Sequence, residues 1–168
     1  MHKIQLKYID FDENQSPRDK GEAEHLLAHS TLKIMLWEYF GIENPQILKN
    51  ENGKPYIEKE GVHFSIAHSN GLCAVAVADL PIGIDCEKLK PRGIEEIEKF
   101  ANRFFVKNEI ELLEKSDYAL LDFYKIWTGK EATIKKLGVN FSYVKKIDTT
   151  KENLEFFEEN NYIVCINI

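Results

Sequence analysis

The chain has 168 residues, of which 22 are Lys or Arg and 28 are Asp or Glu, giving a formal net charge of −6. This length predicts one domain or two fused halves, and the apolar share of 43% argues against a disordered chain or a membrane protein. A net negative charge argues against nucleic-acid binding, which needs a basic surface. Cys73, Cys86 and Cys165 are widely separated, so neither a disulfide framework nor a zinc site is expected.

The first residues contain no apolar segment of the kind found in a signal peptide. The longest apolar run, residues 72–78, is too short to cross a bilayer. We therefore expect a cytoplasmic protein with neither membrane nor nucleic-acid partners.

The first half of the sequence predicts a long helix and several strands. Apolar residues recur first with a period of two and then at helical spacing, and Gly41 ends the helix. Asn52-Gly53 predicts a turn, and a second tight turn is expected at residues 68–71. The expected elements are a strand at 3–9, a helix at 18–40, an extended segment at 55–57, and strands at 62–66 and 72–78.

The second half repeats this order with more helices. Asp117 is the expected N-cap of a long helix that Gly138 ends. We predict an α+β fold of two similar halves, residues 1–80 and 81–168, each with a mainly antiparallel sheet on a long helix. The expected elements are a strand at 82–87, helices at 94–105, from 107 or 108, and at 117–137, and strands at 143–147, 154–157 and 162–168.

Two carboxylates alternate on the strand that begins the second half. Asp85 and Glu87 lie two residues apart, so both project from the same face while Ile84 and Cys86 turn to the other. Such close carboxylates repel unless a cation or hydrogen-bond donors offset their charge, and Mg²⁺ prefers carboxylates, water and phosphate oxygens. The alternative is a strand end with two solvated acids.

A third carboxylate lies in a basic segment of the last long helix. Trp127, Lys130, Glu131 and Lys135 are spaced to share one stripe of this helix. They could form an ordinary Glu–Lys pair beside a core tryptophan, or a metal ligand flanked by two lysines that face phosphate. Residues 125–146 hold six lysines and a single acid, which raises the question of an anionic ligand.

Two shorter features could also bind phosphate. His68 follows the strand Phe64–Ala67, and Lys54 follows the turn glycine Gly53. Each could contact an anion, or be a structural histidine and a solvated lysine. The sequence contains no P-loop and none of the common hydrolase, zinc-protease or dinucleotide-binding motifs.

In this order, the motifs resemble those of the 4′-phosphopantetheinyl transferases, and within them the surfactin-synthetase-activating type with two similar halves in one chain. The resemblance covers residues 20–138, and five short motifs in one order make it specific. The motifs are Gly53-Lys54-Pro55, Phe64-Ser65-Ile66-Ala67-His68-Ser69, Pro81-Ile82-Gly83-Ile84-Asp85-Cys86-Glu87, Arg103-Phe104-Phe105 and Trp127-x-x-Lys130-Glu131-Ala132-x-x-Lys135.

The resemblance implies a pseudo-twofold fold with its site between the halves. It implies transfer of the phosphopantetheine arm of coenzyme A to a serine of an apo carrier protein, with release of adenosine 3′,5′-bisphosphate. Asp85, Glu87 and Glu131 would hold Mg²⁺, or Mn²⁺ in its place. Glu131 would take the proton of the serine, and Lys135 would stabilise the transferred phosphate. The implied contacts to coenzyme A come from Lys54, Pro55, His68, Lys130, Lys135, Arg18 and Lys20.

The sequence departs from the family pattern at Ser30, Ala67 and Cys86. The family often has arginine in the place of Ser30, and a serine hydroxyl is lost at Ala67. These departures leave open a non-catalytic module that binds coenzyme A or a carrier protein. A purely structural domain with solvated carboxylates is a third reading. A monomer suffices if the two halves already build the site. The carrier could belong to fatty-acid, polyketide or peptide synthesis.

Overall fold

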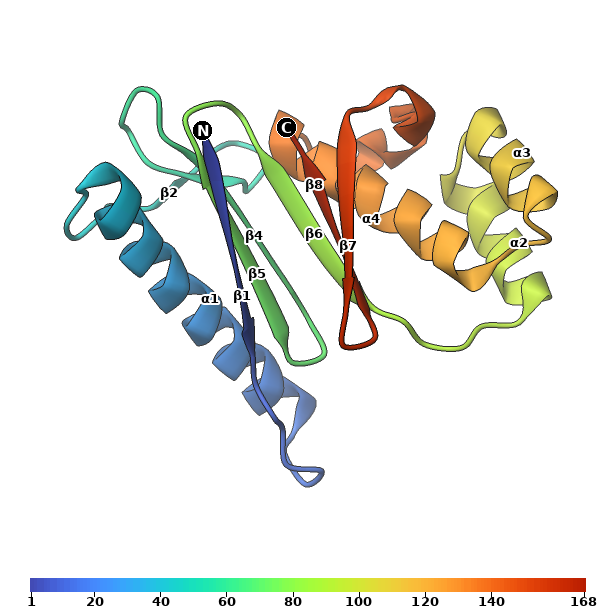
Figure 1. Cartoon of the computed structure of the whole chain (residues 1–168), viewed down its shortest axis with the longest axis horizontal. Helices are drawn as coiled ribbons and strands as arrows, with labels where there is room; N and C mark the ends of the chain where they lie inside the picture. The colour runs from blue at the N-terminus through green and yellow to red at the C-terminus, as the bar shows by residue number, and fades with distance from the viewer.

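A computed structural model describes all 168 residues as helices on either side of two three-stranded antiparallel sheets, with a further small two-stranded antiparallel sheet (Figure 1). The α+β class predicted from the sequence is confirmed. The strands are β1 (His2–Tyr8), β2 (Leu48–Lys49), β3 (Pro55–Tyr56), β4 (His63–Ser69), β5 (Leu72–Ala78), β6 (Gly83–Lys88), β7 (Leu154–Glu159) and β8 (Tyr162–Asn167). The helices are α1 (Pro17–Phe40), α2 (Ile94–Phe104), α3 (Lys107–Lys115) and α4 (Leu120–Leu137), with 3₁₀ turns η1 (Phe141–Lys146) and η2 (Thr149–Lys151).

The first sheet has the order β1-β5-β4, with α1 packed on one face. The central strand β5 is buried along its whole length because it is covered on both faces. Cys73, Val75 and Val77 face α1, while the alternate residues from Leu72 to Ala78 face the second sheet. The helix starts at Ser16, whose hydroxyl accepts a hydrogen bond from the backbone of Asp19, and Gly41 ends it in the left-handed conformation.

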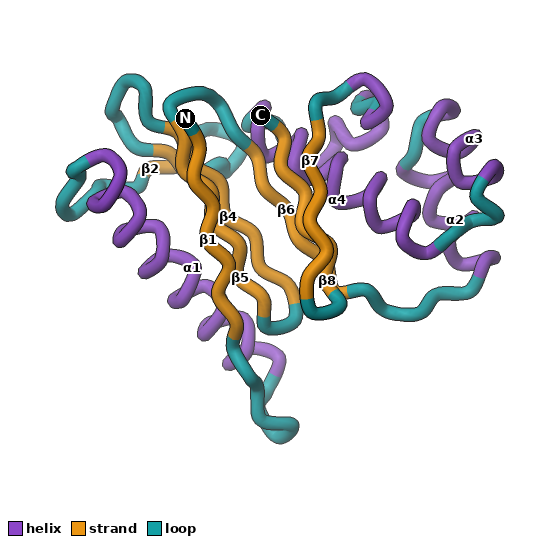
Figure 2. Tube along the Cα trace, in the orientation of Figure 1, coloured by secondary structure: helices purple, strands orange, loops and turns teal.

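The second sheet has the order β6-β8-β7, and α4 packs against β6 and β8. The two sheets therefore follow the same connectivity, because the third long strand of each half lies between the first two. β4 and β6 lie side by side where the sheets meet (Figure 2), and the Ile84 N–H donates to Ser65 Oγ at 3.0 Å. This seam sets the candidate site residues of β6 beside those of the first half.

None of the helices combines the length with the hydrophobicity that a span of the bilayer requires. Two expectations for the second half are wrong. Residues 143–147 form no strand but belong largely to η1, which Asn140 caps by accepting from the Ser142 N–H. Asp117 is not the N-cap of α4, since it has a positive φ of 51° and the helix starts after Ala119.

Candidate functional site

Four charged side chains meet where β6 packs on α4. Lys135 Nζ lies 2.7 Å from Asp85 Oδ1, and the Asp85 side chain is only 6% exposed. The second oxygen, Asp85 Oδ2, is buried without a hydrogen-bond partner. Glu87, two residues along the strand, accepts a hydrogen bond from Ser69 Oγ at 3.0 Å. Glu131 lies one helical turn before Lys135, so α4 presents both to the strand.

Gly83 lets the strand approach the helix closely enough to form this centre. A Cβ atom at Gly83 would lie 1.8 Å from the carbonyl oxygen of Ala132 and 2.6 Å from the backbone nitrogen of Lys136. The backbones of β6 and α4 are therefore in direct contact two residues before Asp85. Any side chain at this position would push the helix, with Glu131 and Lys135, away from the strand.

The charges of the centre change one another's ionisation. Burial, together with the Asp85 and Glu87 carboxylates, raises the pKa of Glu131 to about 7, although Lys135 opposes the rise. Burial and the charge of Asp85 also raise the pKa of Glu87, against hydrogen bonds from Ser69 and Trp127. Burial alone would lower the pKa of Lys135, but Asp85 and Glu131 outweigh it and raise that pKa. Burial likewise raises the pKa of Asp85. The single positive charge of Lys135 therefore does not balance the three carboxylates of the centre.

The donor set fits a hard divalent cation by chemistry, but not as a preassembled ligand cage. No group of three His, Cys, Asp or Glu side chains is arranged to hold a metal ion in this structure. The buried, unpartnered Asp85 Oδ2 and the raised pKa values of Glu87 and Glu131 nevertheless describe oxygen ligands in need of a cation.

A pocket of about 250 Å³ opens beside Lys135 and is lined by both halves of the chain. Lys54 and Pro55 come from the first half, and Lys135 and Gly138 from the second. Lys54 Nζ donates to the carbonyl oxygen of Lys136 at 2.9 Å, and burial lowers its pKa. Three of the predicted site residues, Lys54, Pro55 and Lys135, therefore line one pocket.

His68 is exposed at the end of β4, and a buried acid fixes its ring. His68 Nδ1 lies 2.9 Å from Glu24 Oε2, and the Glu24 side chain is 9% exposed. The other Glu24 oxygen accepts from the backbone N–H of Gly71 at 2.5 Å. Because Nδ1 is bound to Glu24, Nε2 is the ring nitrogen left for a ligand.

The two predicted basic residues at the start of α1 are placed differently. Lys20 lines a separate pocket of about 550 Å³, together with Glu24, Asn70 and Lys88. Arg18 is 85% exposed and pairs with Glu22 one turn along the helix. The structure does not bring Arg18 to the other predicted residues, so its contact to a ligand stays a prediction.

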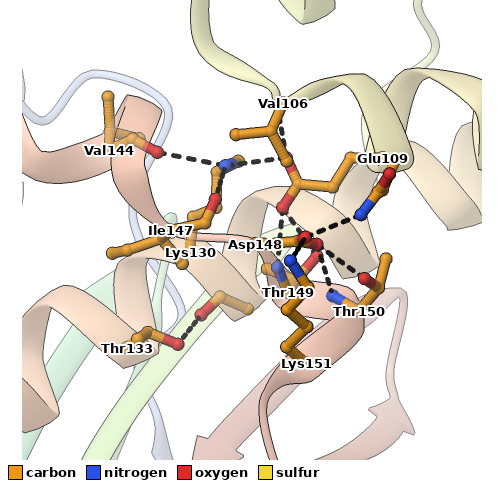
Figure 3. Close-up of polar contacts among 12 residues, drawn as sticks. Val106, Glu109, Lys130, Thr133, Val144, Ile147, Asp148, Thr149, Thr150 and Lys151 are labelled. Carbon is orange, nitrogen blue, oxygen red and sulfur yellow. Dashed lines mark hydrogen bonds and ion pairs between the residues drawn. The ribbon is translucent and has the colours of Figure 1, made fainter.

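The structure contradicts the predicted position of Lys130. We expected it to share a stripe with Glu131 and Lys135, but it is fully buried and points toward α3 (Figure 3). Its ammonium lies 2.7 Å from Glu109 Oε2 and donates to the carbonyl oxygens of Val144 at 3.0 Å and Ile147 at 2.6 Å. All three donors are used inside the protein, so none is left for a diphosphate.

Sequence reasoning missed several residues that shape the site. Glu24 occupies a buried position of α1, four residues before the core residue Ala28. An acid at an apolar position of a helical pattern is the signal that could have found it. Gly83, Ser65 and Ser69 belong to the motifs quoted above, but their contacts with other elements leave no local signal. Ser30, one of the departures, turns its hydroxyl to the carbonyl oxygen of Leu27 on its own helix.

Comparison with known sequences agrees with this arrangement. Residues 81–164 match the profile described as the 4′-phosphopantetheinyl transferase superfamily. The matched segment contains β6 and α4, and with them all four charged residues of the centre.

Three curated relatives show how far the likeness extends. The 4′-phosphopantetheinyl transferase gsp of Aneurinibacillus migulanus is 36% identical over 117 residues, which are 67% of this chain and 47% of the relative. Sfp of Bacillus subtilis (strain 168) is 40% identical over 99 residues, 55% of this chain and 41% of the relative. HetI of Nostoc is 32% identical over 126 residues, 70% of this chain and 52% of the relative. The chain thus spans about half the length of these relatives, and it belongs to the 4′-phosphopantetheinyl transferase superfamily, in its surfactin-synthetase-activating type.

Proposed function

We propose that this protein transfers the 4′-phosphopantetheine group of coenzyme A to a serine of an apo carrier protein. The three curated relatives described above are each named a 4′-phosphopantetheinyl transferase. The observation that carries the proposal is the unpartnered, buried Asp85 Oδ2 among three carboxylates, beside a pocket that Lys54 and Lys135 line. A domain with a purely structural role gains no stability from a cluster of buried carboxylates with an unpartnered oxygen.

The proposed reaction is a phosphoryl transfer. The serine oxygen forms a bond to the phosphorus that carries the pantetheine arm, and the bond to the bridging oxygen of the diphosphate breaks. The serine hydroxyl loses its proton, and adenosine 3′,5′-bisphosphate leaves. Such a reaction depends mainly on positioning and charge neutralisation, which the residues of the centre can supply.

We assign the residues of the centre to separate tasks. Asp85, Glu87 and Glu131 would hold Mg²⁺ or Mn²⁺, and the bound ion would supply neutralisation of diphosphate charge. Glu131 is the general base for the serine hydroxyl, directly or through a water. Lys135, which is 30% exposed, stabilises negative charge on the transferred phosphate.

The substrate contacts follow from the pockets and from His68. Lys54 and Pro55 line the pocket that also holds Lys135, so we assign them to coenzyme A. His68, oriented by Glu24, donates to a phosphate through Nε2, and Lys20 holds a further phosphate in its own pocket. Arg18 is assigned to the same phosphate with no contact to support it, and Lys130 is not assigned to the ligand.

We also propose that residues 1–80 and 81–168 are two halves related by a pseudo-twofold axis. The shared strand order of the two sheets supports this relation, as does the turn between β5 and β6 at the proposed boundary. Because one chain supplies both walls of the pocket, a monomer would be sufficient for activity.

Mass spectrometry of apo carrier proteins tests the function. A panel of apo acyl and peptidyl carrier proteins is incubated with this protein, coenzyme A and Mg²⁺. We expect one carrier or more to gain the mass of a single phosphopantetheine arm, and to gain nothing when EDTA removes the metal. Glu131→Gln and Asp85→Ala should abolish transfer, whereas the control Glu58→Gln, at an exposed loop position, should not.

Two results would change the assignment. Near-wild-type transfer by both Glu131→Gln and Asp85→Ala would mean that the metal and base roles are wrong. Tight binding of coenzyme A by calorimetry without transfer to any carrier would favour the alternative, a non-catalytic module that binds coenzyme A or a carrier protein.

A further inference from the structure

The turn between β2 and β3 binds the C-terminal end of α4 through three side chains. Asn50 Nδ2 and Asn52 Nδ2 both donate to the carbonyl oxygen of Gly138, at 3.1 Å and 3.0 Å. Lys54 Nζ donates to the carbonyl oxygen of Lys136 at 2.9 Å. All hydrogen bonds that this turn makes outside its own hairpin go to the helix end. We call these three side chains the clasp, because they join the first half of the chain to α4.

The end of α4 is a place where such donors stabilise the helix. The last carbonyl groups of an α-helix have no partner within it, and they carry a partial negative charge. Gly138 caps α4 in the left-handed conformation, and its own N–H bonds the carbonyl oxygen of Ile134. The clasp supplies donors to two further carbonyl oxygens and sets the cation of Lys54 at the negative end of the helix dipole. A Cβ atom at Gly138 would lie 3.1 Å from Asn50 Nδ2, so the turn and the helix end are closely packed.

The last turn of α4 also carries Lys135, whose ammonium lies 2.7 Å from Asp85 Oδ1. A lysine side chain has many rotamers, so the place of its ammonium depends on a fixed backbone. From the second half of the chain, Gly83 of β6 packs against the backbone nitrogen of Lys136. From the first half, the clasp binds the same turn at the wall of the pocket that Lys135 lines. The backbone that carries Lys135 is therefore held from both halves.

We propose that Asn50 and Asn52 are positioning residues, which hold the last turn of α4 so that the Lys135 ammonium meets a phosphate of coenzyme A. The inference rests on the proposed function, because it takes the task of Lys135 from it. Without the clasp, the carbonyl oxygens at the helix end lose their donors and the last turn frays. Asn50 lies outside the pocket that Lys135 lines, so it acts on a ligand there through the helix end.

The variant Asn50→Asp separates the clasp from the turn that carries it. Asn50 Oδ1 accepts from the backbone N–H groups of Asn52 and Lys54, and an aspartate keeps both of these bonds. The aspartate has no donor for the carbonyl oxygen of Gly138, so only the clasp is weakened. Asn52→Ala removes the second donor without adding a charge. The control Asn44→Asp adds the same charge as Asn50→Asp at an exposed loop position outside the clasp, and should behave as the wild type does.

Hydrogen exchange in the ligand-free protein tests the clasp independently of the chemistry. We expect the amide groups of residues 134–138 to exchange about tenfold faster in Asn50→Asp and in Asn52→Ala than in the wild type. The amide groups of α1 should exchange as before. Thermal unfolding of each variant shows that the fold is kept. Unchanged exchange of residues 134–138 in both variants would overturn the proposal.

Steady-state kinetics then test whether the clasp acts through Lys135. With a carrier that is modified, Asn50→Asp and Asn52→Ala should each lower kcat about tenfold, because a small displacement of a charged group is costly in phosphoryl transfer, while KM for the carrier stays unchanged. The variant Lys135→Gln keeps a donor for Asp85 but lacks the cation. In this background Asn50→Asp should cause a further loss of less than about twofold. Losses that multiply in the double variant would mean that the clasp does not act through Lys135, and the positioning role would be overturned.

Failure of the proposed function gives a different pattern. A wild type that modifies no carrier refutes that function, and the same variants are then compared by calorimetry of coenzyme A binding. An affinity loss in Asn50→Asp that disappears in the Lys135→Gln background would keep the positioning role toward a ligand phosphate. Equal affinities of the wild type and Asn50→Asp, or no binding of coenzyme A by the wild type, would overturn it.

Discussion

Helix α4 carries two lysine–carboxylate pairs five residues apart, and they differ in how completely they are satisfied. Lys130 and Glu109 are both fully buried, and the ammonium has three partners. The Glu109 oxygens also accept from the backbone of Val106 and from the backbone and hydroxyl of Thr149. Lys135 and Asp85 are as close, at 2.7 Å, but Asp85 keeps a buried oxygen without a partner.

This difference distinguishes a structural ion pair from the pair that we propose to be functional. A buried pair whose hydrogen bonds are all made within the chain has no remaining capacity for a ligand. A buried carboxylate with an oxygen that accepts no hydrogen bond, beside two further carboxylates, is poorly stabilised by the chain's own contacts. Proteins keep such groups where a ligand completes them.

The largest loss should follow from Lys130→Met. The substitution leaves Glu109 buried without its cation and removes the donor to the Val144 and Ile147 carbonyl oxygens. Breaking a buried pair in this way costs about 3–5 kcal/mol. The free energy of unfolding in urea measures the loss. The control Lys99→Met breaks an exposed pair with Glu95 and should cost less than about 0.5 kcal/mol. Equal small losses in both variants would refute a structural role for Lys130.

The centre around Asp85 should instead make stability depend on pH. In the folded, metal-free protein the pKa of Glu131 is raised to about 7 from an ordinary 4.5. Between these values the folded state binds more protons than the unfolded state, so stability falls as the pH rises through this range. Raised pKa values of Asp85 and Glu87 act in the same direction.

Urea unfolding from pH 5 to pH 8 in EDTA measures this dependence. We expect the wild type to lose up to about 3 kcal/mol more than Glu131→Gln over the range. Added Mg²⁺ should restore part of the loss at pH 8 and little at pH 5, because protons compete for the same oxygens. If the stability of the two proteins depended on pH in the same way, Glu131 would not be the carboxylate whose pKa is raised.

A smaller loss is expected from Gly83→Ala. The added Cβ would contact the backbone of Ala132 and Lys136, which cannot yield as a flexible side chain can. Overpacking of this kind costs about 1–3 kcal/mol. The added Cβ also separates β6 from α4. The rate of transfer should therefore fall by a larger factor than the loss of folded protein would explain. Gly93→Ala, where the added Cβ meets open space, is the matched control. Full transfer activity in Gly83→Ala would mean that the close contact does not position the centre.

The sequence was sufficient to predict both sides of the functional centre. Asp85 and Glu87 alternate on a strand, and Glu131 and Lys135 lie at helical spacing, so each pair follows from a local period. The strands around the core followed from the same periods. The segment 143–147 did not, because its apolar residues resemble a strand while Asn140 and Lys130 fix it as a 3₁₀ turn.

Lys130 shows why the remaining contacts of the site could not be predicted from the sequence. Residues 130 and 131 differ by about 100° around the helix, so a shared stripe was only a coarse approximation. Its partner Glu109 lies on another helix, and no local pattern in the sequence predicts a contact between the two residues. The same holds for Glu24, whose role depends on His68 and Gly71 across the sheet. Local periods thus predicted which carboxylates and lysines share a face of a strand or helix, whereas tertiary contacts decide which of these charges are paired within the chain.

The smallest effect on stability should come from Asp85→Asn, compared directly with Glu109→Gln. The amide at position 85 keeps an oxygen for Lys135 and removes a charge that raises the pKa of Glu131. We expect stability to change by less than about 1 kcal/mol, or to increase, while transfer falls at least about a hundredfold. Glu109→Gln should lose several times more stability because it leaves the buried ammonium of Lys130 without the carboxylate that pairs with it. A ¹³C NMR titration should show the pKa of Glu131 falling toward its ordinary value in Asp85→Asn. If Asp85→Asn unfolds as readily as Glu109→Gln and the pKa of Glu131 does not move, the two pairs are equivalent, and the unmet oxygen of Asp85 marks no ligand site.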